Sequence, residues 1–228
     1  MADNNNLKIK GAGLKFLLLF LLAFAGHGTE FIHLFTWEPL IFGEIVSWYS
    51  EPWKLILHWI ATCVLWGIVS YLLIQIAKRK LDFNVCVKGS KMKLWQLITV
   101  AAAVIISVVI SYFAWNSRFK VIVEFNNLGW LRFIFQYLYY MAETVLVLLI
   151  IVFGQKALDI WTKKHFIPWG GIICGLTWGL IHIISRGSFD LQLGLISAVF
   201  CLLYGAVYLL TNRDAKISWV ILFLMFAL

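Results

Sequence analysis

Charged residues are scarce in this chain of 228 residues, where Asp, Glu, Lys and Arg together make up 13%. A soluble globular domain carries about 25% charge, because its surface must face water. Apolar residues instead reach 62% and aromatic residues 17%. Too few charges remain to cover a water-facing surface, so we expect lipid to be the main solvent. The composition also excludes a disordered or collagen-like chain.

Cysteine is equally sparse, with four scattered residues, Cys63, Cys86, Cys174 and Cys201. They form no C-x-x-C pair and have no metal-like spacing, which excludes a disulfide scaffold and a cysteine-based metal site. The chain also lacks an internal repeat and a cleavage pattern after its first apolar run, so we expect that run to be retained. No feature calls for a cofactor, and we predict none.

Apolar runs dominate what remains. Crossing the hydrocarbon layer of about 30 Å takes about 20 residues as a helix. Six runs approach that length: Leu14–Phe35, Trp53–Ala77, Leu94–Trp115, Phe135–Leu158, Phe166–Ser185 and Leu191–Thr211. A last run, Ile217–Leu228, is too short for a comfortable span. We therefore predict an all-α, polytopic transmembrane helical bundle, with six full spans plus a short seventh C-terminal helix, in a single integral membrane domain over residues 1–228.

The 19 basic residues divide unevenly between the two sides of this topology. Fourteen lie at or before the start of the first span, or at or after the ends of the second, fourth and sixth: Lys8, Lys10, Lys15, Lys78, Arg79, Lys80, Lys88, Lys91, Lys93, Lys156, Lys163, Lys164, Arg213 and Lys216. The others are Lys54, Arg118, Lys120, Arg132 and Arg186. The positive-inside rule then predicts a cytoplasmic N-terminus in the cell membrane, with Thr36–Pro52 outside. Topology and anionic lipid account for the net charge of +8, so we predict no nucleic-acid partner.

A few ionisable residues fall inside the predicted spans, where each costs at least about 2.5–3.5 kcal/mol at the helix centre. The first span contains His27, Glu30 and His33, and the second contains His58. Glu143 lies in the fourth span and His182 in the fifth. In the predicted topology all of them fall in the outer third of the bilayer. We therefore expect a shared polar cavity that opens on the outer half.

These residues differ in what their surroundings predict. We expect water to solvate His27, Glu30 and His33 near the interface; their spacing on one helix face makes them only weak candidates for metal ligands, and we predict no metal. His58, next to Trp59, reads as interfacial. Glu143 has no basic neighbour in sequence and needs a partner from another helix. His182 is the natural candidate for that partner.

Small residues surround His182. Gly171, Gly175 and Gly179 recur at every fourth position, which produces a smooth stripe on one helix face and allows a neighbouring helix to approach closely. His182 follows three residues after Gly179. We therefore expect its imidazole to face a helix interface and not lipid.

A Glu-bearing span followed by Trp178-x-x-x-His182 resembles the CPBP family, the CAAX-protease and bacteriocin-processing intramembrane proteins. The family's motifs are E-E-x-x-x-R, F-x-x-x-H and H-x-x-x-N/D on successive spans, and the resemblance covers about the last 140 residues. This chain departs from them. Only Glu143 represents the double Glu, apolar Val147 or Leu148 stands at the Arg position, and the third His aligns near Met225.

The resemblance implies an intramembrane endopeptidase in which Glu143 is the catalytic base and His182 orients water or stabilises the oxyanion. His27, His33 or His58 would have to replace the missing third-motif His. Two alternatives stay open. One is a catalytically degenerate family member that binds a peptide or protein partner, in an immunity or chaperone-like role. The other is a small transporter or channel subunit, although the inverted repeats typical of transporters are absent.

Overall fold

The computed structural model describes residues 2–185 and 189–228, and this part of the chain contains helices, turns and loops but no strand. An all-helical bundle is thus confirmed. Its elements are α1 (Ala2–His27), α2 (Thr29–Phe35), α3 (Trp37–Phe42), α4 (Pro52–Leu81), α5 (Leu94–Ala114), α6 (Lys120–Thr162), α7 (Trp169–Cys174), η1 (Gly175–Gly179), α8 (Leu191–Leu210) and α9 (Ala215–Ala227). Arg186, one of the basic residues expected outside, lies beyond the described residues.

Five helical stretches in the described chain are long and apolar enough to cross a membrane. They are Gly11–Phe42, Pro52–Leu81, Leu94–Ala114, Lys120–Thr162 and Leu191–Leu210. Three of them, α4, α5 and α8, agree closely with the predicted spans. The short terminal helix is also present, as α9.

The predicted full span Phe166–Ser185 is not among the five. Its helical part is α7 followed by η1, a π-helical turn, and the chain then turns at His182–Ser185. At 1.5 Å per residue, α7 and η1 together extend only about 16 Å. The glycines of this segment pack against the backbone of α8, so its apolar character reflects contact with neighbouring helices instead of a full crossing of lipid.

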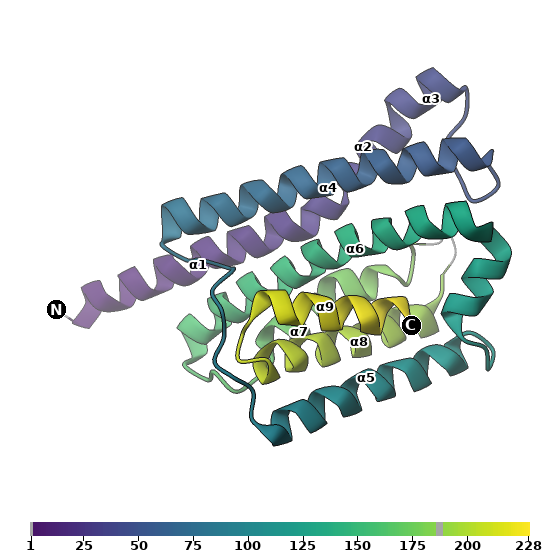
Figure 1. Cartoon of the computed structure of the whole chain (residues 1–228). Helices are drawn as coiled ribbons and strands as arrows, with labels where there is room; N and C mark the ends of the chain where they lie inside the picture. The colour runs from purple at the N-terminus through teal and green to yellow at the C-terminus, as the bar shows by residue number, and fades with distance from the viewer. Residues whose placement is uncertain (1, 186–188) are drawn as a thin grey trace.

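The helix α6 forms the centre of the bundle (Figure 1). It contacts α1 and α4 on one side and α7 and α9 on the other, while α5 lies at the edge against α8 and α9. Every residue from Leu146 to Phe153 is buried. A helix that is apolar on all sides is stable only when other elements surround it, as they do here.

The same helix begins 15 residues earlier than the predicted span Phe135–Leu158. Gly129, with φ 71° and ψ 168°, interrupts it at a conformation that side-chain-bearing residues rarely adopt. The part before Gly129 carries the charged residues Lys120 and Glu124. Because of these charges, the predicted span did not include it.

The loops rich in basic residues meet at one end of the bundle. The Arg213 Nη1 atom lies 2.6 Å from Asp159 Oδ2, and Gln96 Nε2 donates to Asn212 Oδ1 at 2.8 Å. Asp214 caps α9 by accepting the Lys216 and Ile217 N–H groups, and it also accepts the Gly89 N–H. Burial alone would raise the pKa of Asp214, but these three backbone hydrogen bonds outweigh it and lower the pKa. We call the opposite end of the bundle the outer end, following the predicted topology.

Candidate functional sites at the outer end

Two breaks in the first membrane stretch shape the outer end. The helix α1 ends at His27, and after Gly28 the chain continues as α2. Thr36, with φ −111° and ψ −83°, leaves the helical conformation and starts α3 in a new direction. Pro39 is tolerated in the first turn of α3, where its missing N–H costs nothing. Because of the bend at Thr36, Glu38 returns toward His33.

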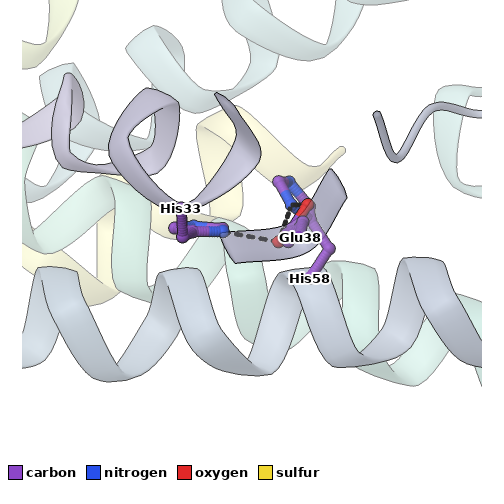
Figure 2. Close-up of side chains that lie close together, drawn as sticks. All are labelled: His33, Glu38 and His58. Carbon is purple, nitrogen blue, oxygen red and sulfur yellow. Dashed lines mark hydrogen bonds and ion pairs between the residues drawn. The ribbon is translucent and has the colours of Figure 1, made fainter. Parts of the chain in front are cut away.

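Figure 2 shows three side chains that converge from α2, α3 and α4. The Oε1 atom of Glu38 lies 2.5 Å from His33 Nδ1 and 2.9 Å from His58 Nδ1. His33 and Glu38 have no exposed surface, and His58 is 6% exposed. The three ligand-type atoms lie within 4.8 Å of one another. We call this group the His33–Glu38–His58 cluster.

Each imidazole of the cluster is also held at its other nitrogen. Thr62 Oγ1 donates its hydrogen to the His58 carbonyl at 2.9 Å, so it accepts from His33 Nε2, also at 2.9 Å. His58 Nε2 lies 3.1 Å from Glu30 Oε1, and Glu30 in turn accepts the Tyr139 hydroxyl at 3.1 Å. The network therefore ties α2, α3, α4 and α6 together.

Four contacts in this network need one hydrogen each: His33 to Thr62, His33 to Glu38, His58 to Glu38 and His58 to Glu30. Every ring nitrogen of the two histidines therefore has a partner within 3.1 Å.

The weak metal candidates His27, Glu30 and His33 do not come together as one set. His33 belongs to the cluster, Glu30 holds His58 from outside it, and His27 lies elsewhere. The expectation that water solvates His33 is wrong, because the residue is fully buried. Glu38 was missed, since the sequence placed it in an outer loop; the apolar run that continues past it to Phe42 was the available signal.

His27 faces the interior of the bundle. Its ring lies between the Trp66 and Trp178 indoles, with centroids 5.5 and 6.2 Å away. Both ring nitrogens are buried, and neither has a hydrogen-bond partner in the described part of the chain. A buried imidazole without partners is costly, so the structure leaves unused polar capacity at this position.

Glu143 is half-buried in α6 near the same region. Within residues 2–185 and 189–228, its carboxylate makes no hydrogen bond and no ion pair with another side chain. Its electrostatic neighbours include Glu30 and Lys120, and the Glu143 main chain lies near the His27 ring. Lys120 contacts the Tyr140 ring at 4.5 Å. Lys120 thus places a positive charge near Glu143 without a direct ion pair.

His182 follows the π-helical turn η1, which coincides with the glycine stripe. Its ring packs edge-on against Trp178 with centroids 4.5 Å apart, and its Nδ1 atom lies 2.7 Å from the Trp178 carbonyl. It also interacts electrostatically with His27. Gly179 lies against the Ala198 backbone, so the imidazole faces the bundle as the stripe predicted. Single π-helical turns inside helices are frequent at functional sites.

One more buried carboxylate lies at the outer end, and its partners are complete. Glu124 accepts the Tyr140 hydroxyl at 2.7 Å and the Tyr137 hydroxyl at 3.1 Å, and the Gln136 amide lies 3.3 Å away. Glu124 is 6% exposed. Its satisfied state contrasts with that of Glu143.

The polar residues at the outer end largely contact one another. A hollow in the surface instead lies at the basic end, where Gln96, His165 and Arg213 are among the residues that line it. In place of one shared cavity, the described residues form two groups at the outer end: the network around Glu38, and His27, Glu143 and His182 around Trp178.

Comparison with known proteins found no relative. No protein-family model, no curated protein and no solved structure matches this chain. No family is assigned. The function has to be argued from the two groups of residues themselves.

Proposed function

We propose that this chain is a membrane-embedded hydrolase that cleaves a peptide bond at the outer end of the bundle, with Glu143 as the general base. One observation carries the proposal. Both ring nitrogens of His27 are buried without a hydrogen-bond partner in the described part of the chain, beside the Glu143 main chain, whereas Glu124 and the network around Glu38 are satisfied by their neighbours. Unpaired buried polar groups destabilise a fold, so they persist where a reactant supplies the missing partner.

The chemistry requires a base, a donor for the developing oxyanion and a group that orients water. The Glu143 carboxylate, which makes no side-chain hydrogen bond within the described residues, would fill the first role. His27, at the end of α1, and His182, which follows η1, interact with each other and would supply the other two. His27 would thereby take the place of the third-motif His that the resemblance to CPBP proteins implies, and Lys120 would supply the charge of the missing Arg.

The test is cleavage in a reconstituted membrane. The purified protein is placed in liposomes together with detergent-extracted membrane proteins, and new N-termini are identified by chemical labelling and mass spectrometry. We expect Glu143→Gln to lower their rate of appearance at least about 100-fold, because a general base contributes about 10²–10⁴ to the rate.

Glu124→Gln is the matched control, since it removes a buried carboxylate from the same helix and keeps an amide oxygen for the two tyrosine hydroxyls. This variant should cleave at the normal rate. Identical N-termini from the unmodified protein and Glu143→Gln would reject the hydrolase and favour the partner-binding alternative. Solute flux through liposomes, without cleavage, would favour the transporter.

A further inference from the structure

The His33–Glu38–His58 cluster is a hydrogen-bond network made of residue types that also bind metal ions. We propose that it binds one divalent transition-metal ion of the zinc type, through His33 Nδ1, His58 Nδ1 and a carboxylate oxygen of Glu38. The site is separate from Glu143, and the proposal does not depend on the hydrolase.

The donor set is the first argument. Two imidazoles and one carboxylate are a common ligand set for zinc, with a fourth position left for water or a substrate. The three donors come from α2, α3 and α4, and all three are buried. Such a combination of nitrogen and oxygen donors favours zinc-like ions over Ca²⁺ and Mg²⁺, which prefer oxygen ligands alone.

The groups behind the two histidines are the second argument. A metal-binding His almost always donates its other ring N–H to an oxygen acceptor, which fixes the tautomer and the ring orientation. Both histidines have such an acceptor: Thr62 Oγ1 for His33 Nε2 and Glu30 Oε1 for His58 Nε2. The hydroxyl of Thr62 is itself fixed by the His58 carbonyl, and Glu30 by Tyr139. Both Nδ1 atoms are thereby directed at Glu38.

The geometry requires only a small expansion. A tetrahedral zinc ion with bonds of about 2.0–2.1 Å separates its ligand atoms by about 3.3 Å. In the structure, Glu38 Oε1 lies 2.5 and 2.9 Å from the two Nδ1 atoms. Each Nδ1 atom must therefore move away from Glu38 Oε1 by less than about 1 Å, and the two Nδ1 atoms, which lie within 4.8 Å of each other, must reach the same spacing; rotations of the three side chains can provide these shifts.

The experiment uses the full chain, purified in detergent without a polyhistidine tag and freed of metal. Zn²⁺ is titrated in by calorimetry. We expect one ion per chain, and we expect Ca²⁺ and Mg²⁺ at the same concentrations to give no binding. Glu38→Gln and His58→Asn should each abolish stoichiometric binding.

Two further variants keep the outcome decisive. His165→Asn, at the basic end and largely exposed, should retain one ion per chain. Thr62→Val keeps the ligands and the side-chain shape but removes the acceptor for His33, so we expect one ion per chain to bind with an affinity about 10–100-fold lower. If a variant of a ligand residue does not fold, Thr62→Val still tests whether the cluster binds the ion. Equal Zn²⁺ affinity in the unmodified protein and Thr62→Val, or no binding to either, would overturn the proposal.

Discussion

Adding one methyl group at Gly171 should separate α7 from α8. A Cβ atom there would lie 2.6 Å from the Cys201 carbonyl oxygen and 3.0 Å from Gly205 Cα, both of them backbone atoms that cannot rotate away. Ordinary contact distances are about 3.5–4.0 Å, so the helices must move apart by roughly 0.5–1 Å. Overpacking of this kind costs about 1–3 kcal/mol, against a gain of up to about 1 kcal/mol from the better helix propensity of Ala.

Gly67→Ala is the matched control, because a Cβ atom at Gly67 has no neighbour within 4 Å. It should raise the free energy of unfolding by about 0.4–1 kcal/mol. Gly171→Ala should lower that free energy by about 1–2 kcal/mol, as measured by far-UV circular dichroism during unfolding in SDS. The same variant should reduce cleavage, since the stripe positions His182. Equal stability of the two variants would refute the close approach of α7 and α8.

Two more predictions concern the basic end. Asp214→Ala should lower the unfolding free energy by about 1 kcal/mol, because it removes the side-chain cap of α9. The pKa of Asp214 is lowered in the fold, so its carboxylate stabilises the folded state at neutral pH, and this stabilisation is lost as the pH falls below the ordinary pKa of 3.8. Acid unfolding curves of Asp214→Asn should not show this loss. An identical acid response of the variant and the unmodified protein would contradict the prediction. Cys86 is exposed in the loop between α4 and α5. A membrane-impermeant maleimide should label Cys86 in inverted vesicles only, whereas buried Cys201 should react only after unfolding. Labelling of Cys86 in right-side-out vesicles would mean that the predicted topology is inverted.

Hydropathy alone was sufficient for three of the helices that are long and apolar enough to cross a membrane. The predicted bounds of α4, α5 and α8 differ from those in the structure by a few residues, since each is a continuous apolar run between polar loops. The hydropathy prediction was wrong for an apolar segment that other helices of the protein surround. The segment 166–185 is apolar because α6 and α8 surround it, and no count of apolar residues separates that case from a full span.

The candidate sites could also be predicted only in part. Glu143 and His182 stay predictions as site residues, and the expected contact between them is not among the contacts of the described residues. The sequence could not identify the partners, because these depend on how each helix is rotated about its axis. His27 faces Trp178, whereas His33, on the continuation of the same stretch, faces His58. Glu38 was missed because the bend at Thr36 brings a residue of an apparent loop into the bundle.

The central claim is that His27 and Glu143 act together in one reaction centre. A double-mutant cycle on cleavage rates tests it most directly, with His27→Asn, Glu143→Gln and the double variant compared in the same liposomes. Residues that act as a unit show strongly non-additive effects. We predict that His27→Asn slows cleavage in the unmodified protein and causes no further loss in Glu143→Gln. Full activity of His27→Asn, or losses that multiply in the double variant, would contradict the account.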